Sequence, residues 1–260
     1  MLSKELYPMI FKRKSFHTFR NWKTKLSYSE EYRISDDEYA DILQAFESFD
    51  RLFPEIRVAM RIADNKETSC ARGQEKVLLF YSEEKGNYLL NIGYICEQLD
   101  LYLALRNIGA LWFGLNIARM PDYKGLKYVI MIAVCKVPED SFRKDVYKAK
   151  RKTAEEIWHG DQINGISEIV RFAPSACNTQ PWIIEHRDDT LDVYRYRSPI
   201  RKWVMPVDGV IHFNHIDIGI FLCFLELCLD QEGYTYKRKL FIDDKNEEMN
   251  LVARYENISA

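Results

Sequence analysis

The sequence lacks the signatures of several common functional classes. Its 37 Lys and Arg residues almost balance 39 Asp and Glu residues, so the net charge of -2 predicts no general attraction to nucleic acid or to an anionic membrane. No Gly-x-Gly-x-x-Gly or Walker pattern occurs, which argues against a dedicated dinucleotide-binding domain. The nucleophile-elbow pattern Gly-x-Ser-x-Gly is also missing, so hydrolase chemistry has no sequence support.

Cysteine and histidine are also sparse, and their spacing indicates no metal site. The six cysteines, at positions 70, 96, 135, 177, 223 and 228, form no Cys-x-x-Cys pair and no zinc pattern. We expect reduced, mostly buried thiols in a cytoplasmic protein. His212 and His215 have the i, i+3 spacing of two ligands on one helix face, but no third ligand is evident. A structural or capping role is therefore favoured over a metal site.

No segment has the features of a membrane anchor. The first ten residues contain no long apolar run and no cleavage signal. The most apolar window, residues 216–229, contains Asp217 and Glu226 and is short for a bilayer span. It predicts a buried helix, and we expect no membrane partner.

The 260 residues, 47% of them hydrophobic, contain an internal similarity. Asn-Ile-Gly at 91–93 and Asp-Ile-Gly at 217–219 each begin a helix-length apolar segment, and the offset is 126. The strand-like run 54–62 lies 127 residues before the one that begins at Pro181, and helix-like patterns at 37–49 and 162–172 precede the two runs. Two tandem units of helix, hairpin and long helix are predicted. Chance similarity between short apolar helices is the alternative.

Residues 171–182, Arg-Phe-Ala-Pro-Ser-Ala-Cys-Asn-Thr-Gln-Pro-Trp, are the most informative segment. Pro174 disfavours helical geometry before it and ends the preceding helix pattern. Ser175 and Asn178 are short polar side chains that hydrogen-bond nearby backbone. Residues 182–187 and 191–196 then read as a hairpin. The pattern predicts a tight loop that holds a flat polar ligand. The alternative is a plain helix stop and hairpin entry without a ligand.

The string at 173–182 resembles the flavin-contacting loop of the nitroreductase family in order and spacing. The resemblance implies an FMN-dependent, NAD(P)H-using oxidoreductase. It also implies that four loop residues contact the flavin: Pro174, Ser175, Ala176 and Asn178.

A basic string near the N-terminus resembles the Arg-Arg-Ser-x-Arg opening of the same family. Arg13, Lys14 and Ser15 would bind the FMN phosphate through charge-assisted bonds. His17 stands where the family often carries Arg, so its flavin contact departs from the pattern. The run that follows the strand pattern of 128–134 contains Arg151 and Lys152, which the resemblance assigns to the same phosphate. A solvated linker or a nucleic-acid patch is the alternative for this run.

Residues 105–114 resemble the family's Gly-Leu-Gly-x-x-Trp segment, which packs beside the flavin. Gly109 and Trp112 are the candidate contacts, although Leu111 replaces one glycine of the pattern. Gly109 also reads as an ordinary helix C-cap.

Together these matches resemble the TM-nitroreductase group of tandem-half proteins. They imply an α+β fold in which residues 1–158 and 159–260 are related halves of a pseudo-dimer, with one FMN per chain and no homodimer required. Such a protein would pass hydride from NAD(P)H through the flavin to a small electron acceptor, with no catalytic acid or base of its own. A non-catalytic FMN-binding or sensing protein is the rival hypothesis, and a flavin-free structural protein is a third. We expect neither nucleic-acid partners nor a metal.

Overall fold

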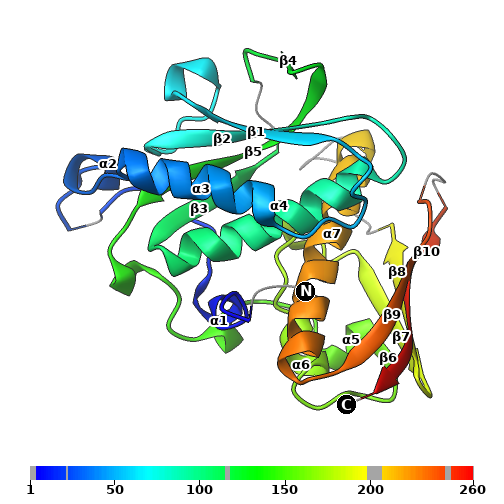
Figure 1. Cartoon of the computed structure of the whole chain (residues 1–260). Coiled ribbons are helices and arrows are strands. Elements are labelled where there is room, and N and C mark those ends of the chain that lie inside the picture. The colour runs from blue at the N-terminus through cyan, green and yellow to red at the C-terminus, as the bar shows by residue number, and fades with distance from the viewer. Residues whose placement is uncertain (1–3, 22, 115–117, 198–206, 244–246, 260) are drawn as a thin grey trace.

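Two sheets and two long helices form the frame of the protein (Figure 1). The computed structural model describes residues 4–21, 23–114, 118–197, 207–243 and 247–259. The N-terminal unit contains α1 (Met9–Lys12), α2 (Tyr28–Glu31), α3 (Asp36–Ser48), β1 (Val58–Ala63), β2 (Lys76–Ser82), α4 (Tyr88–Leu105), β3 (Ile108–Phe113), β4 (Asp122–Tyr123) and β5 (Leu126–Lys136). The C-terminal unit contains α5 (Ala154–Ile157), β6 (Trp158–Gly160), α6 (Ser167–Val170), β7 (Trp182–Arg187), β8 (Thr190–Tyr196), α7 (Val207–Gln231), β9 (Thr235–Leu240) and β10 (Met249–Ser259). Four short 3-10 helices lie in the connections between these elements: η1 (Asn65–Glu67), η2 (Glu139–Ser141), η3 (Val146–Lys148) and η4 (Ala176–Asn178).

Local sequence explains where several elements begin and which faces they bury. Ser35 caps α3, accepting from the backbone N–H of Glu38 while the Glu38 side chain accepts from the Ser35 N–H. Strand β8 alternates buried and partly exposed side chains, as expected for a sheet with one solvent face. Strand β2 is buried along nearly its whole length, because the first sheet is covered on both faces.

The two sheets share one strand order. The first runs β1-β2-β5-β3, with the short β4 paired to β5, and the second runs β6-β7-β8-β10-β9. Apart from β4 and β6, each sheet consists of a hairpin, a long helix in the connection, and two further antiparallel strands. Strand β6 pairs with β7 in parallel and has no counterpart in the first sheet.

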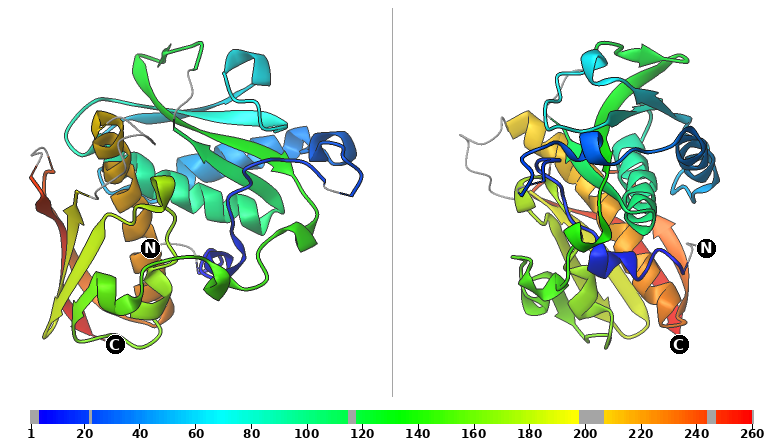
Figure 2. Two further views of the ribbon diagram at one scale, coloured as in Figure 1. Left: turned by 180° about the vertical axis from the view of Figure 1, so that it is seen from behind. Right: turned by 90° about the vertical axis from the view of Figure 1, so that its left-hand side faces the viewer.

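The long helices α4 and α7 cross at a pair of glycines between the two sheets (Figures 1 and 2). A Cβ atom built on Gly93 would lie 2.0 Å from the carbonyl oxygen of Ile216, and one built on Gly219 would lie 2.0 Å from that of Leu90. Only glycine permits this approach. A single hydrophobic cluster extends through the crossing, with buried residues from both units.

The structure confirms some boundaries and corrects others. The predicted hairpin is β7 and β8, with β8 beginning one residue early at Thr190. The helix expected over 162–172 is only α6, Ser167–Val170, and the strand expected from Pro54 begins at Val58. The proposed domain boundary between 158 and 159 falls within β6, which pairs with β7, and the division into two halves stays a prediction.

Helix α7 is longer than the apolar window predicted. Residues Ile211–Gln231 have a mean hydropathy of 1.4, so length and composition do not exclude a membrane span, contrary to our expectation, whereas the predicted buried helix is confirmed. The apolar side chains have another explanation, because 83% of that window is buried against α4 and the sheets.

Candidate functional site

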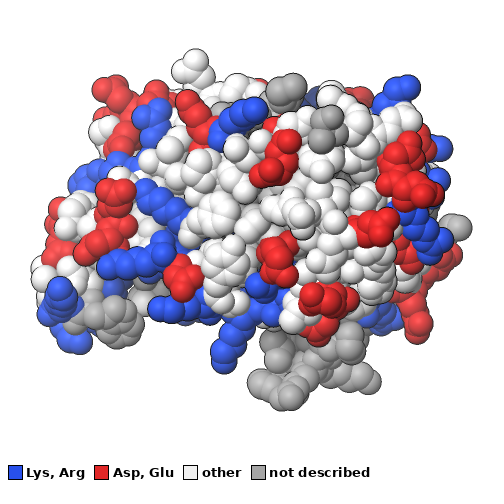
Figure 3. Space-filling model, turned by 90° about the horizontal axis from the view of Figure 1, so that it is seen from below, with Lys and Arg blue, Asp and Glu red and all other residues white. Residues whose placement is uncertain are grey.

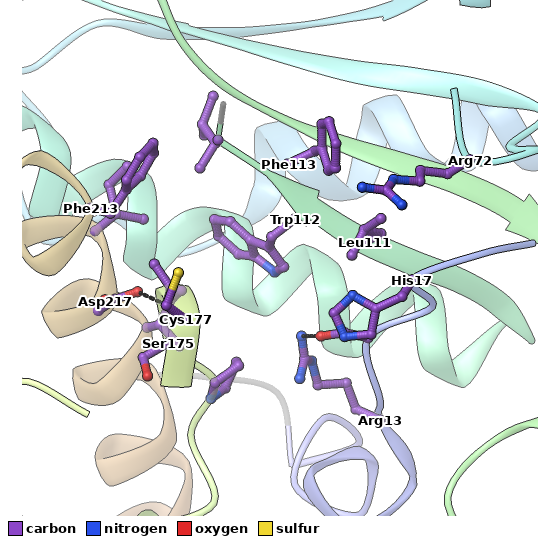
Figure 4. A pocket seen from close by; sticks show the side chains of 17 residues that line it. Arg13, His17, Arg72, Leu111, Trp112, Phe113, Ser175, Cys177, Phe213 and Asp217 are labelled. Atoms are coloured by element: carbon purple, nitrogen blue, oxygen red, sulfur yellow. Dashed lines mark hydrogen bonds between the residues drawn. The ribbon is translucent and has the colours of Figure 1, made fainter. Parts of the chain in front are cut away.

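A pocket of about 290 Å³, called the main pocket here, lies between the two units (Figure 4). The N-terminal segment, strand β3, the loop before β7 and helix α7 form its walls. Its lining residues are Arg13, Ser15, His17, Arg72, Leu111, Trp112, Phe113, Gly114, Ile130, Pro174, Ser175, Ala176, Cys177, Phe213, Ile216, Asp217 and Ile220. The two motifs that the sequence places about 160 residues apart therefore meet at one cavity.

The loop at 174–180 keeps its shape through unusual backbone angles and local hydrogen bonds. Cys177, Asn178 and Gln180 have φ values of 51°, 56° and 49°, in the left-handed region. The Gln180 N–H donates to Ser175 Oγ at 2.9 Å and the Ala176 N–H donates to Asp217 Oδ1 at 2.8 Å. The second bond ties the loop to α7, so this part of the pocket wall is built before any ligand enters.

Arg13 is a buried cation oriented toward the pocket by a carboxylate. Its residue is 4% exposed and directly follows α1. Its Nε–H donates to Asp100 Oδ2 at 2.8 Å, and Nη2 donates to Ser15 Oγ at 3.3 Å. The indole N–H of Trp112 donates to the same Asp100 oxygen at 2.8 Å. One carboxylate on α4 thus orients both the arginine and the aromatic wall.

Positive charge accumulates beside Arg13. Burial and the charge of Arg13 lower the pKa of Arg143, while burial and the charge of Arg143 lower that of Lys14. Burial, followed by Arg13, Arg143 and Arg171, lowers the pKa of Arg151 to about 10. The guanidinium groups of Arg143 and Arg151 remain charged at neutral pH. Within the described residues no carboxylate forms an ion pair with Arg143 or Arg151.

The second acid near Arg13 does not cancel this excess. Glu97 Oε1 lies 3.7 Å from Arg13 Nε, but neither Glu97 oxygen has a hydrogen-bond partner in the described structure. Burial raises the pKa of Glu97 well above its ordinary value, which favours the neutral acid. Figure 3 shows both acidic and basic side chains on one outer face of the protein, which is not uniformly basic.

Five residues assigned from the sequence do not line the main pocket: Lys14, Gly109, Arg151, Lys152 and Asn178. Asn178 accepts from Arg151 Nη1 at 2.6 Å and donates to the Lys150 carbonyl at 3.1 Å. Lys152 is engaged with Gln180 and the Tyr196 hydroxyl. The Lys14 ammonium lies over the Phe16 ring, 4.6 Å from its centroid.

Gly109 is the fifth, and it lies inside strand β3 opposite Cys135. A Cβ there would lie 3.0 Å from the Phe16 ring, so Phe16 packs between this glycine and solvent. The C-cap interpretation of Gly109 is wrong, because α4 ends at Leu105 and the left-handed residue after it is Asn107.

Several residues of the site were missed by sequence reasoning. Asp100 and Asp217 lie in the two apolar segments that match at the 126-residue offset. An acid within such a buried helix is the signal that could have identified them. Arg72, which lines the pocket, and Arg143, whose charge interacts with that of Arg13, both lie in loops and carry no local signal. Arg72 lines the pocket with its guanidinium carbon 5.1 Å from the centroid of the Phe113 ring.

The cysteine and histidine predictions have simple outcomes. All six cysteines are free, and five are buried, with Cys177 exposed at the main pocket. His215 contacts the Ile211 and Asp243 carbonyls and the Asp243 carboxylate. Among the described residues no group of three His, Cys, Asp or Glu side chains could hold a metal ion.

A second pocket of about 520 Å³ is lined by residues of α4, of α7 and of the segment that follows α7. Its lining residues are Asp50, Arg51, Tyr94, Glu226, Asp230, Tyr234, Thr235, Tyr236 and Arg238. Glu226 lies at its centre, where both carboxylate oxygens accept from Arg238 Nη1, at 2.7 and 2.8 Å. The hydroxyls of Tyr94 and Tyr255 also donate to Glu226, each at 2.7 Å.

A family model described as "Putative TM nitroreductase" matches residues 5–229. The chain belongs to this family. This confirms the family resemblance found in the sequence.

One solved structure shows the same fold. A protein from Thermotoga maritima described as a putative nitroreductase is 18% identical, with a TM-score of 0.59, covering 97% of this chain and 93% of its own. Two others have TM-scores of 0.43. A Clostridium acetobutylicum protein described as a putative NADH oxidase is 15% identical and covers 60% of this chain and 99% of its own. A Desulfovibrio desulfuricans putative nitroreductase in complex with FMN is 14% identical and covers 61% and 98%. No curated protein matches the chain.

Proposed function

We propose that the protein is an FMN-dependent oxidoreductase that passes hydride from NAD(P)H to a small electron acceptor. The observation that carries the proposal is Arg13 in the wall of a pocket with aromatic walls, together with two further cations, Arg143 and Arg151, whose charges interact with that of Arg13. A ligand with a dianionic group at one end and a flat ring system at the other matches both features. Family membership, and a relative described as binding FMN, point to the same cofactor.

The chemistry of the donors fits FMN. Arg151 Nε is buried without a hydrogen-bond partner in the described structure, and its guanidinium is crowded by like charges. A phosphate placed among these arginines would satisfy that donor and relieve the repulsion. Arg13, Arg143 and Arg151 would hold the phosphate, with Ser15 close to Arg13 Nη2.

The remaining walls would position the ring system and exclude water. Leu111, Trp112 and Phe213 present apolar and aromatic surface to the cavity (Figure 4). Pro174, Ser175 and Ala176 form a preorganised edge, because Asp217 fixes the loop to α7. Bound FMN would supply the redox chemistry between NAD(P)H and the acceptor. The chain then needs no nucleophile, and we assign no catalytic acid or base.

We further propose that the two units form a pseudo-dimer around the α4–α7 crossing. The matching strand orders, the facing glycines and the constant sequence offset support it. Each unit contributes one wall of the main pocket, so a monomer would carry a complete site with one FMN. The free thiols suit a reducing cytoplasm.

The test is the flavin itself. Purified protein should be yellow, release FMN on denaturation with a stoichiometry near one per chain, and bleach with NADH or NADPH in the absence of air. Light scattering should find the flavin-bound form as a monomer at low concentration. Colourless protein that binds no added FMN would overturn the proposal. Bound flavin that neither nucleotide bleaches would instead favour a non-catalytic FMN-binding protein.

A further inference from the structure

Asp217 is a buried acid in the wall of the main pocket. The residue is 2% exposed, and Oδ1 accepts from the Ala176 N–H at 2.8 Å. Oδ2 lies 3.4 Å from Thr179 Oγ1. Both contacts are to the loop at 174–180, so this one side chain on α7 fixes the loop at two points. Figure 4 shows the carboxylate beside the loop, across the pocket from Arg13.

The N-terminal unit has a neutral side chain in the corresponding position. Asn91 precedes Asp217 by the 126-residue offset and lies on α4. Its Oδ1 accepts from the Phe53 N–H at 3.1 Å, and its Nδ2 donates to the Phe53 carbonyl at 3.4 Å. Each long helix therefore anchors the loop that precedes the hairpin of its own unit. Asn91 shows that such an anchor needs an acceptor and does not need a charge.

The surroundings of Asp217 favour its neutral form. Burial raises its pKa to about 8, against the opposing effect of the Ala176 and Thr179 hydrogen bonds. Cys177 is the titratable group that faces it from the loop, and α4 presents Leu90 and Gly93 at the crossing. Arg13, His17 and Arg72 lie on the opposite wall of the pocket.

Thr179 can accommodate either protonation state. Its single hydroxyl proton can go to Asp217 Oδ2, or to Asn214 Oδ1 at 3.5 Å. With Asp217 ionised, the hydroxyl donates to the carboxylate. With Asp217 neutral, the acid proton can be donated to Thr179 while the hydroxyl turns to Asn214. The same three side chains thus form a hydrogen-bonded chain in both states.

We propose that Asp217 is a positioning residue that anchors the pocket loop in its neutral form and weakens the binding of an anionic ligand when it ionises. The ligand part rests on the proposed function, since FMN is the anion expected in this pocket. Ionisation would put a negative charge into the wall of a site built for a phosphate-bearing ligand. The anchoring part concerns the apo-protein alone.

The first experiment measures apo-protein stability against pH by chemical denaturation. A carboxyl whose folded-state pKa lies above its unfolded value stabilises fully below the unfolded pKa of 3.8 and loses that contribution as pH rises through about 8. Asp217→Asn keeps the acceptor and cannot ionise. The variant should therefore gain stability over the wild type progressively from about pH 4 to pH 8, with no further gain above. A difference that stays constant over this range would overturn the neutral anchor.

The second experiment titrates FMN into apo-protein by flavin fluorescence between pH 6 and 9.5. From pH 6 to pH 9.5, the FMN affinity of the wild type should fall by a factor about five times larger than the affinity of Asp217→Asn does. This is the effect expected for one like-charge interaction across a partly screened pocket. Asp217→Ala removes the acceptor and should bind FMN more weakly at every pH. Asn91→Asp is the matched control and should show the wild-type profile, because the new acid lies outside the main pocket. The proposal would be refuted if wild type and Asp217→Asn showed the same pH profile of FMN affinity. It would also be refuted if Asp217→Asn and Asp217→Ala weakened FMN binding equally. If wild type binds no FMN, the proposed function fails and the stability experiment still decides the role of Asp217.

Discussion

The two pockets are lined in part by residues that correspond at the 126-residue sequence offset, but they differ in charge. At the 126-residue offset Glu226 corresponds to Asp100, Arg238 to Trp112, and Tyr94 to Ile220. In the main pocket the carboxylate of Asp100 orients Arg13 and Trp112, and further cations beside Arg13 lack a carboxylate partner among the described residues. In the second pocket the carboxylate of Glu226 binds the guanidinium of Arg238 through both oxygens.

This difference in charge explains why two pockets on similar backbone arrangements would provide only one anion-binding site. The second pocket is lined by three acids, Asp50, Glu226 and Asp230, and by two arginines, Arg51 and Arg238. Glu226 forms an ion pair with Arg238. Its loop, at 49–54, also lacks the polar string of the loop at 173–182. An FMN phosphate would meet carboxylates there, so we expect flavin in the main pocket alone.

The largest effect is expected from removing the carboxylate of the second pocket. Glu226→Ala leaves the hydroxyls of Tyr94 and Tyr255 buried without an acceptor and unpairs Arg238. The unfolding free energy should fall by about 3 kcal/mol, the lower end for a broken buried pair because Arg238 is partly exposed. FMN affinity of the folded variant should stay near wild type. Urea denaturation and flavin titration measure the two effects.

Asp100→Ala is the matched change in the main pocket. It unpairs Arg13, so it should lower both stability and FMN affinity. If Glu226→Ala weakens FMN binding as much as Asp100→Ala does, the assignment of flavin to the main pocket is wrong.

A substitution at the helix crossing should damage the frame that both pockets share. Gly219→Ala places a Cβ against the Leu90 carbonyl, a backbone atom that a side-chain rotation does not move away. We expect a loss of about 1–3 kcal/mol in unfolding free energy, typical of an overpacked core. Thermal denaturation checks it. Gly86→Ala is the control, because a Cβ there meets nothing within 4 Å and only the left-handed φ of 51° is disfavoured. A smaller loss at Gly219 than at Gly86 would mean that the helices separate easily.

The parts of the fold that follow from local sequence were predicted well. The apolar segments after Asn91 and Asp217 indicated α4 and α7, and their glycines are the residues that meet at the crossing. The hairpin of β7 and β8 follows from alternation and a short polar turn. Pro174 does end the helical region, but α6 keeps only four residues, because a short helix depends on tertiary packing more than on its own periodicity.

The site was predicted less completely, since much of it depends on long-range contacts. The motifs identified Arg13, Ser15, Trp112 and the loop, and the fold brings these to one cavity. They gave no sign that Asn178 would turn toward Arg151, or that Phe16 would cover Gly109. Arg143 enters from a loop after β5, where no local pattern distinguishes a site arginine from a solvated one.

Removing the central cation should have a moderate effect specific to the phosphate. Hydrogen bonds to charged groups are worth about 1.5–3 kcal/mol, so Arg13→Ala should weaken FMN binding by about one to two orders of magnitude. Riboflavin, which lacks the phosphate, should bind wild type and variant about equally, as measured by fluorescence titration. Arg238→Ala removes an arginine from the second pocket, serves as the control, and should change neither affinity. Equal losses for FMN and riboflavin would place the contribution of Arg13 in folding.

The smallest effect is expected at Asn178, whose counterpart at the same offset is the buried Leu52. Asn178→Asp keeps an acceptor for Arg151 but loses the donor to the Lys150 carbonyl. The new carboxylate would compete with the phosphate for Arg151, so FMN affinity should fall by about three- to tenfold, less than for Arg13→Ala. Riboflavin separates the two roles of this residue. Unchanged riboflavin affinity is expected if Asn178 acts through Arg151, as its contacts indicate. A parallel loss for riboflavin would mean that Asn178 contacts the ring or the ribityl chain, as the family resemblance implies, and that the loop rearranges when flavin binds.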